Sequence, residues 1–443
     1  MINTPINNEI VRRAKERCGV NDLGSASIRE IVKLVNIIER KTGTRFIRME
    51  MGVPGLPAAD VAIEAEIAAL KKGVASIYPD IEGIPELKSE GSRFAKLFLD
   101  LDVTPEHIIP TAGSMMGGMA TFMVANRNDH QKEGTLFIDP GFPVQKSQIK
   151  ILGQEYQSFD VYNYRGEKLK DKLESYLKTG RVSTILFSNP NNPSWVCLTE
   201  RELEIIGTLA KKYDAIVIED LAYFGMDFRV DCSVPGKPPY QPTVSKYCDD
   251  YIILVSGSKA FSYAGQRIAI MIISDHLFDR RYPDLRRYYS SDVFGRAMIF
   301  GAVYSLSSGV THSVQYGFAA ILKATNDGMY NFVEQTKEYG RKAAIMKRLF
   351  TENGFRIVYD MDIDRPVADG FYFTISYPGF TGGQLLDTLL CYGISAIGLQ
   401  ITGSDRHEGL RACVSQVRQD QMDTLEERLK LFRLNNPVKY MVE

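Results

Sequence analysis

Residues 251–274 read YIILVSGSKAFSYAGQRIAIMIIS. The segments at the two ends, YIILVS and RIAIMIIS, are rich in β-branched and other apolar residues, which is typical of strands buried on both faces of a sheet. Between them, small and hydroxyl-bearing residues surround Lys259 and lead to Arg267. A buried strand followed directly by such a polar segment predicts a ligand site at the carboxyl end of the strand.

Four further segments share this apolar character. They are HIIPT (107–111), TLFIDP (135–140), STILFS (183–188) and AIVIED (215–220). Amphipathic segments alternate with them, and Thr199 with Glu202 forms a T-x-x-E capping box at the start of one predicted helix. Strands that alternate with helices predict βαβ units, and therefore an α/β domain with a mostly parallel central sheet and helices on both of its faces.

The two ends of the chain have a different pattern. Residues 27–42 place apolar side chains at helical spacing, and after about residue 325 helical segments alternate with GFYFTISY and GLRACVS, which predicts a smaller α+β domain. A chain of 443 residues is also too long to fold around one compact hydrophobic core. We expect an N-terminal arm associated with the small domain (1–55), a large domain that holds the predicted ligand site (56–325) and a small C-terminal domain (326–443).

The composition argues against several classes of function. The 53 Lys and Arg residues nearly balance the 54 Asp and Glu residues, so we expect no nucleic-acid partner and no membrane partner. The six cysteines form no CxxC pair and the histidines are more than twenty positions apart, which favours reduced thiols and no metal site. No apolar run is long enough to span a bilayer or to serve as the core of a signal peptide. We therefore expect a cytoplasmic protein.

Five strand ends carry polar or glycine-rich residues, which predicts one shared site. The segment AGSMMGG and the serines beside Lys259 offer N–H groups and hydroxyls, and Arg267 offers a planar cation; all of these suit a phosphate. Asp220 ends an apolar strand, where a carboxylate is costly unless it meets a cation. A phosphate, a protonated ring nitrogen and a requirement for a lysine amine together point to pyridoxal 5'-phosphate.

These motifs resemble those of the class I/II aminotransferases, which are fold-type I pyridoxal-phosphate enzymes, over about residues 27–430. SGSKAFSYAGQR is similar to S-x-S-K…G-x-R, EDLAY to D-x-A-Y and NPNNPSW to N-P-x-N-P-T-G. The resemblance implies that Lys259 forms the Schiff base, that Asp220 bonds the pyridine nitrogen and that Tyr223 bonds the ring hydroxyl. The other cofactor-binding residues that it implies are Gly113, Ser114, Met115, Phe142 (stacked on the ring), Asn192 (on the ring oxygen), Ser256, Ser258 and Arg267.

Three further motifs concern the substrate and the oligomer. YPDIEGIPELK resembles a segment whose tyrosine reaches the cofactor phosphate of the neighbouring subunit, which implies a role for Tyr78 and a homodimer with its active site at the subunit interface. GLRACVS and MGVPGLP resemble the segments that bind the substrate, which implies Arg411 on the α-carboxylate, Gly52 in the loop over the site, and Asn192 close by. Trp195 departs from the family pattern, which has glycine at that position.

The resemblance implies an aminotransferase that moves an amino group between an L-amino acid and a 2-oxo acid. The implied mechanism is ping-pong, through an internal aldimine of Lys259. A C–S β-lyase, or another fold-type I enzyme acting on an amino acid, would show the same lysine, aspartate and arginine, so this alternative stays open.

The sequence leaves the substrate side chain undecided. An acidic substrate would be selected by a second arginine, for which the candidates are Arg286, Arg287 and Arg296. An aromatic substrate would instead be favoured by Phe294 or by the single tryptophan, Trp195.

Overall fold

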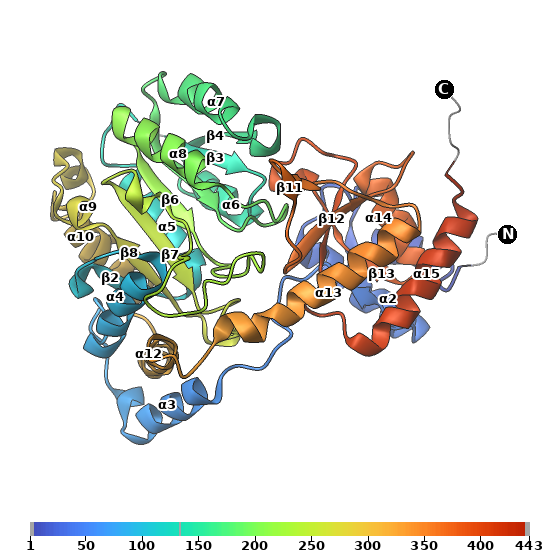
Figure 1. Cartoon of the computed structure of the whole chain (residues 1–443), viewed down its shortest axis with the longest axis horizontal. Helices are drawn as coiled ribbons and strands as arrows, with labels where there is room; N and C mark the ends of the chain where they lie inside the picture. The colour runs from blue at the N-terminus through green and yellow to red at the C-terminus, as the bar shows by residue number, and fades with distance from the viewer. Residues whose placement is uncertain (1–3, 133, 439–443) are drawn as a thin grey trace. The chain divides into compact units, whose positions relative to one another are not determined.

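A computed structural model describes residues 4–132 and 134–438 (Figure 1). The chain divides into two compact units. Unit 1 comprises Met1–Gly55, Asn192–Val196 and Lys337–Glu443, and unit 2 comprises Leu56–Asn191 and Cys197–Thr336. Unit 1 is therefore assembled from the two ends of the chain and the short internal segment Asn192–Val196, whereas unit 2 is almost continuous in sequence.

Unit 2 contains a seven-stranded sheet in the order β2-β8-β7-β6-β5-β3-β4. Only β8 is antiparallel to its neighbours, β2 and β7, and the other adjacent pairs are parallel. The mostly parallel sheet predicted from the sequence is confirmed. The strands are β2 (Ile108–Thr111), β3 (Gly134–Asp139), β4 (Glu155–Asp160), β5 (Val182–Ser188), β6 (Ile216–Asp220), β7 (Tyr251–Ser256) and β8 (Ala269–Ile273).

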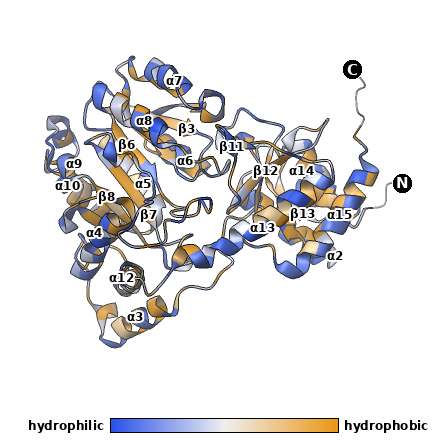
Figure 2. Cartoon of the chain, viewed as in Figure 1, coloured by the Kyte–Doolittle hydropathy of each residue, from blue (hydrophilic) through white to orange (hydrophobic). Residues whose placement is uncertain are grey.

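Two hydrophobic cores cover the two faces of this sheet. Alternate residues of one strand enter different cores: Ile253 and Val255 of β7 lie in one, and Ile252 and Leu254 lie in the other. This double burial explains why the strands are apolar at consecutive positions. Figure 2 shows the hydrophobic colour concentrated on the strands of the sheet, while the helices around it also carry hydrophilic residues.

Helices of unit 2 pack on both faces of the sheet. Side chains of α4, α7, α8 and α12 join the first core, and those of α5, α6 and α10 join the second. The capping box that the sequence predicts at Thr199 is present at the start of α8. The helices are α3 (Asp60–Lys71), α4 (Pro85–Leu99), α5 (Gly113–Ala125), α6 (Pro143–Ile151), α7 (Lys168–Leu177), α8 (Glu200–Lys212), α9 (Asp275–Asp279), α10 (Phe294–Arg296), α11 (Tyr304–Ser307) and α12 (His312–Asn326).

Unit 1 joins N-terminal and C-terminal segments. Strand β1 pairs in parallel with β13, with Ile47 opposite Ile394, and a separate four-stranded antiparallel sheet has the order β14-β15-β12-β9. The helices are α1 (Asn8–Cys18), α2 (Ile28–Thr42), α14 (Gly382–Cys391) and α15 (Met422–Asn435), and α13 (Phe332–Glu352) begins in unit 2 and ends in unit 1. The strands are β1 (Ile47–Arg48), β9 (Arg356–Ile357), β10 (Met361–Asp362), β11 (Arg365–Pro366), β12 (Tyr372–Ser376), β13 (Ile394–Ser395), β14 (Ile397–Gly398) and β15 (Leu410–Cys413).

Within the described residues, no helix is long and apolar enough to cross a membrane.

Candidate active site

A cluster suited to an anion forms at the carboxyl end of β7 in unit 2. Because β8 is antiparallel to β7, Arg267, which lies just before β8, reaches the sheet edge where β7 ends. Arg267 Nη1 donates to Ser258 Oγ at 3.3 Å, and the Ser256 hydroxyl accepts from Ser258 N at 3.1 Å. The guanidinium and both hydroxyls therefore meet at one point, as the sequence predicts for a phosphate site.

Helix α5 completes this cluster with its N-terminus. Its first residue, Gly113, has φ +76° and lies so close to Arg267 that a Cβ atom there would be 2.4 Å from Arg267 Nη2. No side chain among the described residues caps this helix N-terminus, and Ser114 and Met115 follow in its first turn. Uncapped N–H groups and the positive end of the helix dipole favour an anion at this place.

Asp220 presents a buried carboxylate at the end of β6. Its side chain accepts hydrogen bonds from Ala222 N and from Gln145 Nε2, both at 3.1 Å, and forms no ion pair among the described residues. Burial raises the pKa of Asp220 to about 6, because no cation offsets the lost hydration. A cationic ring nitrogen would supply the missing partner, so this carboxylate fits the predicted cofactor.

Three more predicted residues lie on the loops of unit 2. Lys259 is half-buried in the segment after β7, and Tyr223 is buried just beyond β6. Phe142 is half-buried at the start of α6 and belongs to neither of the two cores described above. A phenylalanine at a strand end that is left out of these cores is available to pack on a ligand.

In unit 1, Arg411 on β15 is a buried cation without a carboxylate partner. Its side chain is 1% exposed, and within the described residues it forms no ion pair. Arg411 Nη2 donates to Glu50 O at 2.7 Å and Nη1 to Asn192 Oδ1 at 3.3 Å, while the guanidinium lies 4.5 Å from the centre of the Tyr372 ring. A buried guanidinium held only by neutral groups is suited to a carboxylate ligand.

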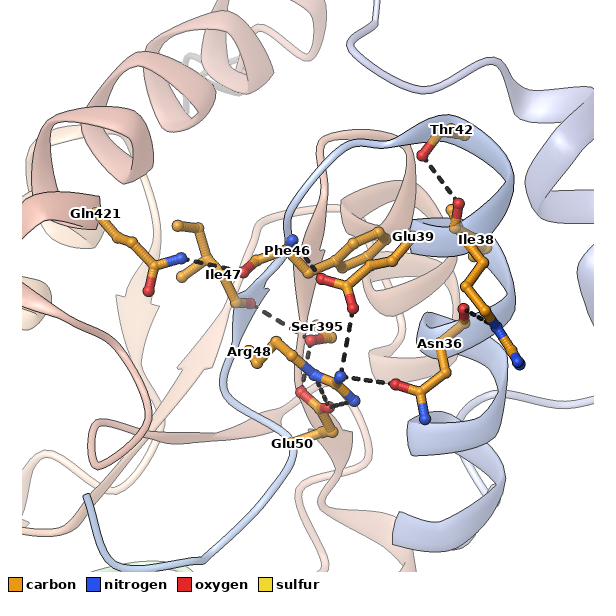
Figure 3. Close-up of polar contacts among 11 residues, drawn as sticks. Asn36, Ile38, Glu39, Thr42, Phe46, Ile47, Arg48, Glu50, Ser395 and Gln421 are labelled. Atoms are coloured by element: carbon orange, nitrogen blue, oxygen red, sulfur yellow. Dashed lines mark hydrogen bonds and ion pairs between the residues drawn. The ribbon is translucent and has the colours of Figure 1, made fainter. Parts of the chain in front are cut away.

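Glu50 holds the backbone that orients Arg411, and nothing in the sequence distinguishes it from other glutamates. The Glu50 side chain is fully buried; its Oε1 pairs with Arg48 Nη2 at 2.7 Å and its Oε2 accepts from Ser395 Oγ at 2.6 Å (Figure 3). Gly52 lies two residues after Glu50, and a Cβ there would lie 2.0 Å from the hydroxyl oxygen of Tyr372. The loop with the predicted Gly52 is thus packed against the same tyrosine as Arg411.

Trp195 is part of the packing of unit 1, and its use for an aromatic substrate stays a prediction. It is fully buried, its ring centre lies 6.1 Å from that of Tyr372, and a Cβ on Gly370 would lie 2.0 Å from its ring. Its φ is +63°, a left-handed conformation that favours glycine, which explains why the resembled family has glycine at this position.

The Trp195→Ala substitution is expected to destabilise the protein by about 3–5 kcal/mol, because it leaves a large cavity in unit 1. Trp195→Gly should cost about 1 kcal/mol less than Trp195→Ala, since glycine relieves the positive φ. Urea unfolding of both variants measures the difference. Equal stability of the two variants would show that the backbone at residue 195 is not strained.

The other residues considered for substrate selection lie in unit 2, and their role stays a prediction. Phe294 is fully buried in the second hydrophobic core, and Arg286 pairs with Asp292 at 3.2 Å. Arg287 pairs with Asp284, and Arg296 is exposed. Within this chain, therefore, Phe294 is a core residue and these arginines are surface residues.

Comparison with known proteins identifies the family. The sequence profile described as "Aminotransferase class I and II" matches residues 45–359. The chain belongs to this aminotransferase family. The match includes all the predicted cofactor residues of unit 2, and it supports an aminotransferase rather than the C–S β-lyase alternative.

Relatives of this aminotransferase and solved structures agree with that assignment. A probable aspartate aminotransferase of Methanocaldococcus jannaschii is 25% identical over 361 residues, which cover 81% of this chain and 82% of the relative. An aromatic-amino-acid aminotransferase of Thermococcus litoralis is 24% identical over 338 residues, covering 74% and 77%. An alanine aminotransferase structure from Pyrococcus furiosus has a TM-score of 0.73 at 19% identity, covering 94% of this chain and 98% of the other, which confirms the fold-type I architecture.

Proposed function

We propose that this aminotransferase uses pyridoxal 5'-phosphate and that the residues predicted from the sequence hold it. The observation that carries the proposal is that unit 2 contains two separate charged groups. One is the buried carboxylate of Asp220, which has no cation partner among the described residues, and the other is the anion-binding cluster of Arg267, Ser258 and Gly113. A cofactor with a phosphate at one end and a protonated nitrogen in its ring supplies both missing charges.

The other predicted residues would complete the cofactor site. Ser114 and Met115 would donate backbone N–H groups to the phosphate, together with Ser256. The ring would be contacted by Phe142, Tyr223 and Asn192.

The residues of the chain would then perform the proton chemistry. When bound, the cofactor supplies a ring that accepts electrons from the α-carbon of the amino acid. Lys259 Nζ would remove the proton from the α-carbon of the amino acid in the first half-reaction, and it would return a proton to the α-carbon of the second substrate in the second half-reaction. Asp220 would keep the ring nitrogen protonated throughout. The amino acid leaves as a 2-oxo acid before the second 2-oxo acid enters, which is a ping-pong order.

Arg411 is proposed to bind the α-carboxylate of both substrates. We expect Arg411→Lys to raise the KM for the amino acid about 100-fold, with a smaller fall in kcat, because lysine keeps the charge but loses the planar fork of N–H donors. Steady-state kinetics at varied amino acid concentration give both constants. Arg356→Lys, on the exposed edge of the same sheet, is the control, and an unchanged KM in Arg411→Lys would remove this assignment.

The substrate class is tested by adding one amino acid at a time to the protein loaded with pyridoxal phosphate. The first to add are aspartate, glutamate, alanine and phenylalanine, since relatives are named for aspartate and for aromatic substrates. Loss of the cofactor's visible absorption band, with release of a 2-oxo acid, supports transamination and names the substrate. Release of pyruvate and ammonia with the band retained would instead support the lyase.

We further propose a homodimer in which Tyr78 reaches the partner's cofactor. Tyr78 is 88% exposed and lines a cavity of about 840 Å³ with Phe300, which is 47% exposed. Helix α3 also exposes Ile63 and Ile67 by more than 40%. Such apolar exposure is typical of an interface, and light scattering should give twice the 49.8 kDa mass of the chain. A monomer at micromolar concentration would exclude this role for Tyr78.

Two further proposals concern the domains and the location of the protein. We propose that unit 2 corresponds to the predicted cofactor domain (56–325) and unit 1 to the predicted small domain (326–443) with its arm (1–55). We also propose a cytoplasmic location, supported by six cysteines that are all free thiols.

A further inference from the structure

A basic cleft lies on unit 1. It has a volume of about 740 Å³, and its charged lining consists of five cations and one carboxylate, namely Arg40, Arg45, Arg48, Lys342, Arg418 and Glu39. Arg40 lies in α2, Arg45 and Arg48 lie in the segment from residue 43 to the end of β1, Lys342 lies in α13 and Arg418 lies before α15. One cleft therefore gathers positive side chains from four separate parts of the chain, although the net charge of the whole chain is −1.

Two of the five cations are neutralised by neighbouring carboxylates. The Arg48 guanidinium lies between Glu39, at 3.4 Å, and the buried Glu50, at 2.7 Å, and Figure 3 shows all three with Asn36. Arg418 pairs with Asp420 at 2.7 Å. The positive charge that remains in the cleft is therefore carried by the cations that lack such partners.

Among the described residues, two of the other three cations, Arg40 and Arg45, have no carboxylate partner, and Lys342 has a distant one. Within residues 4–132 and 134–438, Arg40 and Arg45 form no ion pair, and both are exposed. Lys342 is different, because its side chain is only 12% exposed and its Nζ lies 4.0 Å from Glu338 Oε1, at the outer limit of an ion pair. Arg40 and Arg45 therefore leave two positive charges on the cleft that no carboxylate among the described residues neutralises.

We propose that the basic cleft binds a small multivalent oxyanion, carried by a phosphate-bearing or a polycarboxylate metabolite. Guanidinium groups match the paired oxygens of phosphate and carboxylate, and the cleft has the volume of a small-molecule site. Gln421 lines the cleft as a further polar group, and its Nε2 donates to Phe46 O at 3.2 Å (Figure 3). This proposal does not depend on the proposed cofactor.

The test is calorimetric titration of the full-length protein, loaded with pyridoxal phosphate so that the cluster around Arg267 is occupied. Sodium pyrophosphate and citrate are the probes, because neither carries an amino group or is a 2-oxo acid. We expect one equivalent of at least one probe to bind, and more weakly as salt rises. Pyrophosphate alone would indicate a phosphate-bearing ligand, and citrate alone a polycarboxylate.

Variants locate the bound anion. Arg45→Gln and Lys342→Met should each weaken binding about 10-fold, as expected for the loss of one charge-assisted hydrogen bond. Arg29→Gln removes the same charge from an exposed position in the first turn of α2, outside the cleft, and should have no effect. Arg45 is exposed, so its variant keeps the test valid if Lys342→Met unfolds. Absence of binding by both probes, or equal weakening by Arg29→Gln, would overturn the proposal.

Discussion

The Lys259→Ala variant is expected to lose transamination by at least about 10⁴-fold, because the side chain proposed to carry the α-proton and to attach the cofactor is absent. The backbone should be unaffected, since Lys259 lies in the loop after β7 and is only half-buried. Single-turnover mixing of the cofactor-loaded variant with the amino acid identified above measures the loss.

Two controls separate this effect from a loss of folding or of cofactor. Lys237→Ala removes an exposed lysine of the same unit and should leave the rate unchanged. Methylamine added to Lys259→Ala should restore part of the activity, because a free amine can take over proton transfer. Full activity in Lys259→Ala, without added amine, would disprove the assignment of this lysine.

Asp220→Asn is expected to lower kcat by about 10³-fold, since a neutral amide cannot hold a proton on the ring nitrogen. Asp220→Glu keeps the charge on a side chain one methylene longer and should lower kcat far less. Steady-state rates of the two variants, at saturating substrate, give the comparison. Equal rates in Asp220→Asn and Asp220→Glu would show that the charge at residue 220 is not required.

The apoprotein offers a second measurement on Asp220 that is independent of activity. Burial raises the folded-state pKa to about 6, above the ordinary value of 3.8, so between about pH 4 and 6 the folded protein retains a proton that the unfolded chain has released. The free energy of unfolding therefore falls as pH rises through this window, by at most about 3 kcal/mol from this group. The Asp220→Asn apoprotein should show a smaller fall than wild type in urea unfolding. Identical pH profiles for wild type and Asp220→Asn would mean that the pKa of Asp220 is not raised in the folded protein.

The sequence predicted unit 2 well because its strands are buried on both faces and its motifs are local. All six strands predicted from apolar runs are present. Strand β4 was missed, since Glu155–Asp160 lies at the sheet edge and is exposed at alternate positions, which gives it a polar sequence. Apolar runs thus reveal central strands but not this edge strand.

Contacts between distant residues could not be predicted in the same way. Gln145 bonds Asp220 from 75 positions away, and nothing near it in the sequence distinguishes it from other polar residues of an amphipathic helix. Glu50 is equally inconspicuous in sequence, although it is buried and supports Arg411 across 361 positions. The positive φ of Trp195 is also a property of the fold, visible in the sequence only as a departure from the family pattern.

The division of unit 1 between the two chain ends has a consequence for biosynthesis. A ribosome adds roughly 5–20 residues per second, and Ile47 of β1 pairs with Ile394 of β13, about 350 residues later. At that rate β1 waits roughly 20–70 s for its partner strand, whereas most of unit 2 emerges as a continuous segment and can fold first. During translation, β1 therefore remains without its partner strand until residues near Ile394 have been added.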